Sequence, residues 1–305
     1  AEGIVTIHLR RGSVPDALAF IEPLARRYAT NLHLQALYAE VLVRAERYEP
    51  AWNAARAALR CNERFVPALK ALVRASLAQG RRRLADTILE QAIEIDGDDP
   101  ELHYIQGTLY RESAERLRDA LDEFEAAVRL RPDYVDARMA LGVQLLSGGR
   151  YEDALGHFQV VVRLMPGSAA AHLNVGDAQR SLRQWDPAKA SFERVLRLDP
   201  NNAPAHFNLG LMHYAIGLER EQQEQIDAMQ LARQHFVQYR NLMGPRLARD
   251  DPSEQYLSEV DRTIQRAQRA IERAARRAAQ QAAREAAAAE AGGADGAAGD
   301  GGEGG

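Results

Sequence analysis

A pattern that recurs every 34 residues constrains the fold of this 305-residue chain more than any other feature. Glycine, alanine, phenylalanine and proline each keep their own place in the pattern. The recurring positions are Gly142, Gly176 and Gly210; Ala154 and Ala188; Phe158 and Phe192; and Pro166 and Pro200. A period of this length, with small, aromatic and proline residues at fixed offsets, is typical of a helix–turn–helix repeat. The pattern therefore predicts an all-α fold.

The apolar residues within one period lie at helical spacing. Leu141 and Leu145 share one face of a first helix, and Ala154 and Phe158 share one face of a second helix. The segment Ser147–Arg150 separates the two helices. Small residues let the paired helices approach closely, and we expect Phe158 to fill the gap against the next unit. Since one helix pair cannot bury both of its apolar faces, successive pairs must stack.

The same register extends to the N-terminus. With one residue inserted in Arg111–Arg118, stepping back from Ala154 places alanine at the four preceding small positions, Ala120, Ala85, Ala51 and Ala17. The aromatic position stays apolar, as Phe124, Leu89, Ala55 and Ile21. We count seven helix pairs. Their second helices are predicted to begin near Asp16, Pro50, Leu84, Leu117, Glu152, Asp186 and Met229.

The seventh pair departs from the period. The step from Ala188 to Ala232 is ten residues longer than the others, and residues 218–229 contain neither Gly nor Pro. We therefore expect the extra residues to lengthen both helices of this pair, in a repeat region that ends at residue 245.

A different pattern fills residues 251–291. Apolar residues follow one another at alternating steps of three and four, which places them on one stripe of a helix. The stripe consists of Leu257, Val260, Ile264, Ala267, Ile271, Ala274 and Ala278. We expect its first half to pack on the last repeat and its second half to be solvated or to meet a partner helix. Residues 292–305 hold only Gly, Ala, Asp and Glu, a composition that predicts a disordered tail.

These residues and their spacing resemble the tetratricopeptide repeat family. The resemblance implies a right-handed superhelix, or α-solenoid, of about seven repeats over residues 1–245, with residues 251–291 as a capping helix. In that family the first helices line a concave groove that binds peptides or protein segments. The matching groove positions are Tyr104, Arg111, Asn174, Asp177, Arg180, Phe207, Asn208, Leu211 and Tyr214. A second contact site is predicted on the C-terminal stripe at Leu257, Val260, Ile264 and Ile271.

Asn174 and Asn208 lie one period apart and resemble the stacked asparagines with which some family members hold a peptide backbone. An Asn amide donates to a carbonyl and accepts from an N–H, so such a pair binds backbone without demanding a sequence. The alternative is that both residues only link neighbouring helices. The Lys and Arg with which the family clamps chaperone tails are mostly replaced here by apolar residues or Asn, which disfavours that partner class.

No catalytic or cofactor motif stands out. The chain has no P-loop, no HExxH and no CxxC. His103, His172 and His206 occupy one repeat position, but equivalent residues of stacked helices lie on the order of 10 Å apart, too far to share a metal. His206 and His213 lie two turns apart and lack a third partner. We therefore predict no enzyme activity, no cofactor and no metal site.

The charge balance disfavours nucleic acid as a partner. The net charge of −4 differs from the strongly basic balance of dedicated nucleic-acid-binding proteins. Residues 253–291 hold seven arginines against six acidic residues. This balance favours a solvated helix with intrahelical ion pairs over a surface for nucleic acid or acidic lipid. No window is apolar enough to predict a transmembrane segment.

The predicted function is a scaffold or assembly adaptor that holds other proteins. The seven repeats, the long Arg/Ala/Gln helix and a first residue, Ala1, that is not Met resemble the tetratricopeptide lipoproteins of myxobacterial gliding-motility complexes. That resemblance implies a periplasmic, outer-membrane-associated protein whose lipid anchor lies upstream of Ala1. Two alternatives stay open: a cytoplasmic co-chaperone or regulatory module, and a non-catalytic part of a truncated larger protein.

Overall fold

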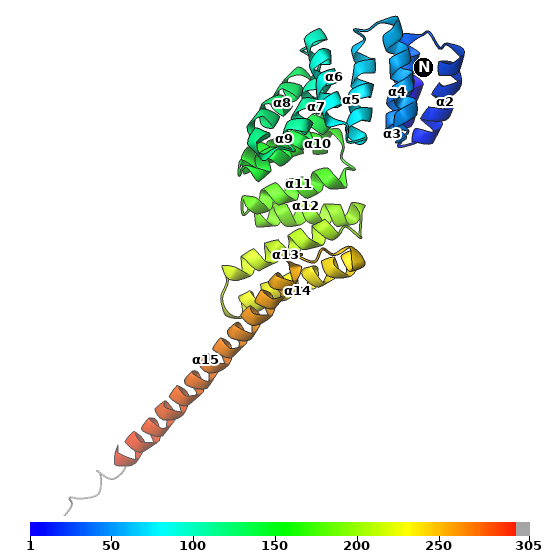
Figure 1. The fold of residues 1–305 in the computed structure, drawn as a ribbon. Coiled ribbons are helices and arrows are strands. Elements are labelled where there is room, and N and C mark those ends of the chain that lie inside the picture. Colours follow the sequence, from blue (N-terminus) through cyan, green and yellow to red (C-terminus); the bar gives the residue numbers. More distant parts are fainter. Residues whose placement is uncertain (297–305) are drawn as a thin grey trace, which may run out of the picture. The chain divides into compact units, whose positions relative to one another are not determined.

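The computed structural model describes residues 1–296, without the side chains of Arg10 and residues 288–296. This part of the chain forms fifteen α-helices and two short 3₁₀ segments, and it contains no β-strand (Figure 1). The helices fall into two compact units, Ala1–Gly148 and Gly149–Gly305. Residues 297–305 of the predicted tail lie outside the described residues.

The N-terminal unit holds nine α-helices. Each even-numbered helix packs on the helix that precedes it, as the repeat pattern predicts. The helices are α1 (Glu2–Arg10), α2 (Val14–Arg27), α3 (Leu32–Arg44), α4 (Tyr48–Cys61), α5 (Val66–Ala78), α6 (Arg82–Ile95), α7 (Pro100–Tyr110), α8 (Leu117–Leu130) and α9 (Val135–Ser147), with the 3₁₀ segment η1 (Ala114–Arg116) before α8.

The C-terminal unit continues the alternation and adds one long helix. Its elements are α10 (Tyr151–Leu164), α11 (Ala169–Ser181), α12 (Trp185–Leu198), α13 (Ala203–Leu218), α14 (Gln222–Met243), η2 (Gly244–Arg246) and α15 (Ser253–Gly296). Helix α11 packs on α12, and α13 packs on α14.

Polar side chains begin four of the first helices. The carboxamide oxygen of Asn31 accepts a hydrogen bond from the Leu34 backbone N–H at 3.0 Å and so caps α3. Asp99, Ser168 and Asn202 cap α7, α11 and α13 in the same way. These caps satisfy backbone donors that the first turn of a helix leaves free.

The recurring glycines make room for the recurring phenylalanines. Phe192 is fully buried, and a Cβ atom on Gly176 would lie 2.6 Å from its ring. The equivalent pairs Gly107–Phe124 and Gly210–Phe236 show the same contact. The ring therefore packs against the glycine of its own repeat, which the sequence did not predict. Phe192 also belongs to a buried cluster with residues of α13, the contact with the next repeat that the sequence did predict.

The N-terminal unit keeps this register with smaller side chains. The four alanines at the small position are at most 1% exposed: Ala17, Ala51, Ala85 and Ala120. Ile21, Ala55 and Leu89, which replace phenylalanine, are at most 3% exposed. The predicted register is therefore confirmed throughout this unit.

The last repeat is longer than the others. Helix α13 has 16 residues and α14 has 22, so the extra residues lengthen both helices. Helix α14 begins at Gln222, seven residues before the predicted Met229, because no glycine or proline interrupts the segment between them.

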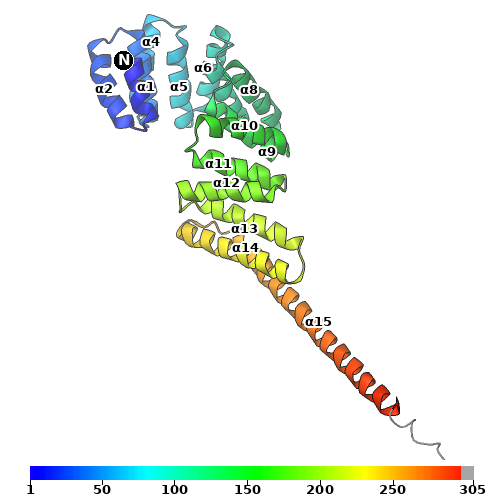
Figure 2. The ribbon, with the colours of Figure 1, turned by 180° about the vertical axis from the view of Figure 1, so that it is seen from behind.

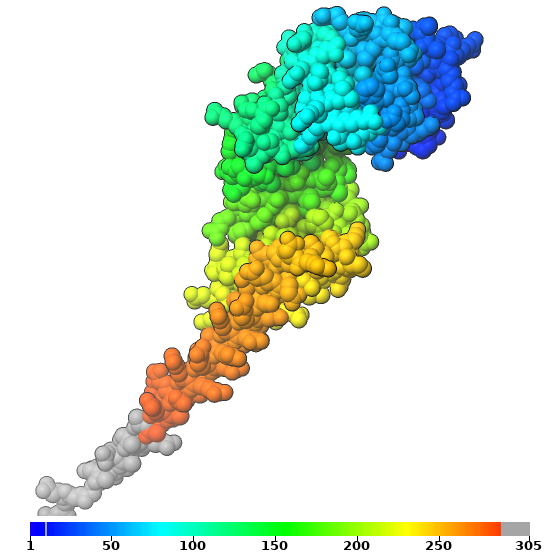
Figure 3. Space-filling view, in the orientation of Figure 1, coloured from blue at the N-terminus to red at the C-terminus, as the bar shows by residue number. Residues whose placement is uncertain are grey.

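Helix α15 packs on α14 over its first turns only. Val260 is fully buried in a cluster with Met229, Ala232 and Phe236 of α14. Beyond this contact α15 runs clear of the other helices of its unit (Figures 1, 2 and 3). It continues to Gly296, five residues into the segment whose composition predicts a disordered tail.

Candidate functional site

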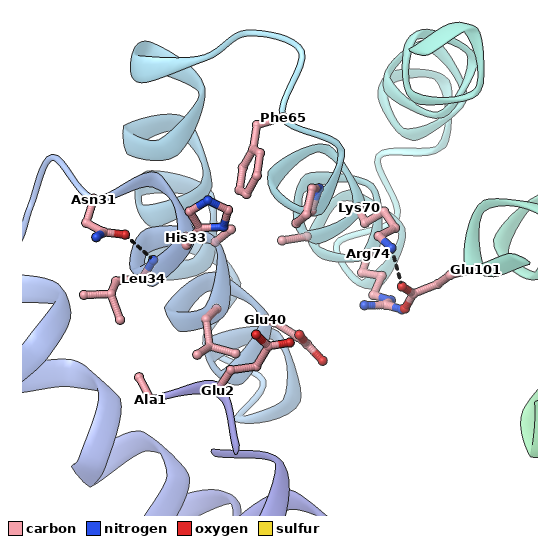
Figure 4. Close-up of a pocket in the computed structure, with 14 residues that line it drawn as sticks. Ala1, Glu2, Asn31, His33, Leu34, Glu40, Phe65, Lys70, Arg74 and Glu101 are labelled. Carbon is pink, nitrogen blue, oxygen red and sulfur yellow. Dashed lines mark hydrogen bonds and ion pairs between the residues drawn. The ribbon is translucent and has the colours of Figure 1, made fainter. Parts of the chain in front are cut away.

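The first helices of the N-terminal unit enclose a cavity of about 590 Å³ (Figure 4). Helices α3 and α5 supply most of its wall, and the starts of α1 and α7 complete it. The apolar part of the wall includes Leu34, Ala36, Leu37, Phe65, Pro67 and Ala71. His33 meets the Phe65 ring nearly at a right angle, with ring centroids 4.9 Å apart. The cavity is thus large enough for an apolar side chain from another molecule.

Paired charges line the side of the cavity that faces α7. The Lys70 ammonium lies 2.8 Å from the Asp99 carboxylate and 2.7 Å from that of Glu101. Arg74 pairs with the same Glu101, and Figure 4 shows these side chains pointing toward one another. The Lys70 side chain is only 16% exposed, so this network is held more firmly than surface ion pairs are.

A second cavity, of about 480 Å³, adjoins the first. The two share Glu40, Arg74 and Glu101 in their walls. The second is also lined by Val43, Arg44, Tyr104, Arg131, Tyr134 and Asp136. The Arg131 guanidinium lies 3.5 Å from the centroid of the Tyr134 ring. Burial raises the pKa of the Tyr134 hydroxyl to about 12. We call the two cavities together the inner groove.

Of the two groove residues predicted in this unit, the structure places one in the inner groove. Tyr104 lines the second cavity, with its ring 5.3 Å from that of Tyr134 and 6.0 Å from that of Phe124. Burial raises the pKa of its hydroxyl. Arg111 follows the last residue of α7, is exposed and lines neither cavity.

In the C-terminal unit, α15 covers three of the predicted groove residues. Phe207, Leu211 and Tyr214 of α13 pack against the cluster that buries Val260. The Tyr256 ring of α15 lies 5.4 Å from that of Tyr214 and 6.2 Å from that of Phe207. These apolar side chains therefore take part in an intramolecular contact.

A hydrogen bond closes the same contact. The Tyr214 hydroxyl donates to Oε2 of Glu259 at 2.6 Å. Burial, together with this bond to a carboxylate, raises the pKa of Tyr214 to about 12. Of the predicted second contact site, Leu257, Val260 and Ile264 belong to the cluster on α14, while Ile271 lies farther along α15.

The two asparagines behave differently from these apolar neighbours. Asn174 and Asn208 are half-buried, and neither amide hydrogen-bonds to another described residue. The interpretation that they link neighbouring helices therefore has no contact to support it. Asp177 and Arg180 bond to each other, with Nε 3.1 Å from Oδ1, so they offer a neutral pair.

Protein-family models match the middle of the chain. Tetratricopeptide repeat models match residues 109–169 and 176–217, which include Gly142, Gly176 and Gly210. The matched residues form tetratricopeptide repeats. The predicted fold class, an all-α tetratricopeptide solenoid, is thereby confirmed together with the helices described above.

Several solved structures resemble this chain in fold at low sequence identity. The Cut9–Hcn1 hetero-tetramer of APC/C matches 84% of this chain and 48% of its own, at 16% identity and a TM-score of 0.65. The pilF protein of Pseudomonas aeruginosa matches 75% and 96%, at 17% identity and 0.59. MamA of Desulfovibrio magneticus, from residue 41 to its end, matches 60% and 97%, at 22% and 0.51. No curated protein sequence matches significantly.

The tetratricopeptide register itself contained a signal for the inner groove. Stepping back 34 residues from Tyr104, a predicted groove position, gives Lys70, and one further step gives Ala36. All three residues line the inner groove. The sequence pattern did not single out Lys70, because the repeats toward the N-terminus match it less closely than those toward the C-terminus.

The last tetratricopeptide repeat also brings three histidines together. Nδ1 of His206 lies 3.1 Å from Nδ1 of His235, and the His213 and His235 rings stack with centroids 5.7 Å apart. His235, on α14, is the third partner that spacing along α13 could not reveal. Burial lowers the pKa of all three, that of His235 to about 4. Even so, no three metal-ligating side chains in the described residues are arranged to hold an ion.

Within the described residues, no helix combines the length and the apolar character needed to cross a bilayer. Helix α15 is long enough, but its residues are mostly Ala, Arg and Gln.

Proposed function

We propose that this tetratricopeptide protein is a non-catalytic scaffold that holds an extended segment of another protein in the inner groove. One observation carries the proposal: a cavity of about 590 Å³ on successive first helices combines an apolar wall with a fixed network of charges. Tetratricopeptide repeats are a fold that proteins use to hold protein partners.

The chemistry of the inner groove suggests how such a segment is held. An apolar side chain of the partner enters the wall formed by Leu37 and Phe65, and its burial supplies most of the affinity. Lys70, Arg74 and Glu101 are already held in ion pairs, so binding costs little side-chain entropy. Their unused donors and acceptors face the partner's backbone.

We propose a second binding position at Asn174 and Asn208. Their amides have no partner in the described residues, and each can donate to a carbonyl while accepting from an N–H. The two amides would bind the backbone of a partner rather than its side chains, so the scaffold could hold partners of different sequence.

Site-specific photocrosslinking in the native host tests the main proposal. A photoreactive residue at Glu40, in the inner groove, should form an adduct with a partner, whereas one at Glu90 on α6 should not. The partner segment is mapped by mass spectrometry and synthesised, and its affinity is measured by calorimetry.

A matched pair of leucine variants then locates the site. Leu37→Ser removes an apolar lining side chain and should weaken binding of the peptide about tenfold or more. Leu84→Ser makes the same replacement at an exposed leucine of α6 and should leave the affinity unchanged. Equal affinity of the two variants would exclude the inner groove as the binding site.

We further propose, from the sequence layout alone, that the scaffold works in a bacterial cell envelope, with gliding motility as the specific context. Fractionation of the native host and detection of the full-length protein would test this location. Recovery in the outer-membrane fraction supports it, and recovery in the cytoplasm favours the co-chaperone or regulatory alternative.

A further inference from the structure

Seven arginines of α15 lie on one face of the helix. They are Arg262, Arg266, Arg269, Arg273, Arg276, Arg277 and Arg284. At about 100° per residue these positions fall within an arc of roughly 100°, and they extend about 33 Å along the helix axis. We call this row the arginine stripe. All seven side chains are exposed.

The predicted intrahelical ion pairs are not found along the stripe. None of the seven guanidinium groups forms an ion pair with a described carboxylate; Nε of Arg262 and of Arg273 instead donates to a backbone carbonyl. Glu272 is the one acidic residue between 262 and 284, so this segment carries a net charge of +6. The net charge of residues 253–291 is close to zero only because the other acidic residues lie at the two ends of that segment.

The acidic residues near the start of α15 are held by the repeats. Oδ1 of Asp261 lies 3.0 Å from Nε of Arg233, and Oε2 of Glu254 lies 3.0 Å from Nη2 of Arg240. Glu259 accepts the hydrogen bond from Tyr214. These contacts dock α15 on the last repeat, while the arginines of the stripe from Arg266 onward form no ion pair with a described carboxylate.

The residues on the other faces of α15 help to distinguish between possible partners of the arginine stripe. The face opposite the stripe carries alanines, and Ile271 is its last large apolar residue, so insertion among lipid chains gains little. Beside the stripe lie Gln265, Ala270, Glu272 and Ala274. A helix in a groove of duplex DNA has phosphates on both of its sides. The two sides of α15 next to the stripe carry no cation, so this arrangement does not favour duplex DNA. A straight row of charges on one side matches a flat anionic surface.

We propose that the arginine stripe binds the surface of an anionic lipid bilayer, with α15 lying along it. Seven arginines fall within the range typical of electrostatic lipid recognition. Since the whole chain carries −4, the residues outside 262–284 carry −10. Repulsion therefore turns the rest of the protein away from the membrane, so that binding through the stripe also orients the repeats.

Co-sedimentation of the full chain with vesicles tests this proposal. The protein should bind vesicles of phosphatidylcholine with about 30% phosphatidylserine at about 0.1 M salt, and should leave them at about 0.5 M salt. It should not bind phosphatidylcholine alone. Changing Arg266, Arg269, Arg273 and Arg277 to Gln should weaken binding roughly 100-fold or more, since Gln keeps the helix and removes the charge.

Two control variants separate the stripe from net charge and from folding. The same four positions changed to Lys should keep binding. Four exposed arginines elsewhere, Arg56, Arg60, Arg83 and Arg129, changed to Gln alter the net charge equally and should bind as the unmodified chain does. Equal loss in both Gln variants would overturn the proposal. So would tight binding of duplex DNA without binding to the anionic vesicles.

Discussion

The Tyr214 hydroxyl of α13 donates a hydrogen bond to Oε2 of Glu259 on α15 at 2.6 Å. This bond links α15 to α13, while the buried Val260 packs α15 on α14. The C-terminal helix therefore covers apolar side chains that would otherwise be exposed at the end of the repeats.

Val260→Asp should detach α15. A carboxylate at this fully buried position has no charge partner in the cluster, and leaving it unpaired costs several kcal/mol. Hydrogen–deuterium exchange should then speed up from Ser253 to Ile264. Ile271→Asp, farther along the helix, serves as the control and should leave this protection intact. Unchanged exchange in Val260→Asp would show that the contact does not hold α15.

Gly176→Ala should destabilise the protein by about 1–3 kcal/mol although alanine favours helices. The new Cβ would lie 2.6 Å from the Phe192 ring, which is fully buried and has little room to move. Gly156→Ala is the matched control, because no atom lies within 4 Å of its Cβ. It should stabilise α10 by about 0.5–1 kcal/mol. Urea unfolding midpoints of the two variants should therefore move in opposite directions.

The histidine cluster should make the last repeat sensitive to acid. The folded protein keeps His235 neutral down to a pKa of about 4, while the unfolded chain takes up that proton near pH 6.5. Stability from this group is therefore present above pH 6.5 and is lost as pH falls toward 4. The positive charge of Lys189, and that of His206 and His213 once they are protonated, opposes protonation of His235.

His235→Gln should reduce this dependence, measured as the urea midpoint between pH 7 and about 4. His172→Gln, at a histidine of α11 outside the cluster, should keep the dependence of the unmodified chain. A pH dependence that is identical in both variants would contradict a role for the cluster.

Asn174→Ala with Asn208→Ala should weaken partner binding about tenfold or more without unfolding the protein. Neither amide bonds to a described residue, so the change in stability should stay within about 0.5 kcal/mol. Asn53→Ala, at an exposed asparagine of α4, is the control. A crosslinking pull-down that recovers the same partners from the double variant as from the control would exclude the asparagine pair.

The repeat register could be predicted because helix crossings leave a mark in the sequence. Ala17, Ala51 and Ala85 are buried where two helices meet, and only a small residue fits there. Because each repeat needs one small residue at this crossing, small residues recur with the repeat period. The register could therefore be followed into repeats that lack the recurring glycine.

Contacts outside the period could not be predicted in this way. Tyr214 and Glu259 lie 45 residues apart, and His235 reaches His206 from a helix of irregular length. No repeat spacing joins these pairs, so only the packed helices reveal them. The shape of the inner groove likewise depends on the ion pairs that Lys70 and Arg74 form with Glu101. Other rotamers of these side chains would break the ion pairs, and the sequence does not show which rotamers are adopted.

The sequence by itself determined the class of fold, the number of repeats and the residues buried between helices, because these follow from local periodicity and side-chain size. The tertiary structure decided which surfaces stay open. Helix α15 covers Phe207, Leu211 and Tyr214, while Asn174, the inner groove and the arginine stripe stay accessible. Exposure depends on every neighbour of a residue at once, and most of those neighbours are distant in the chain.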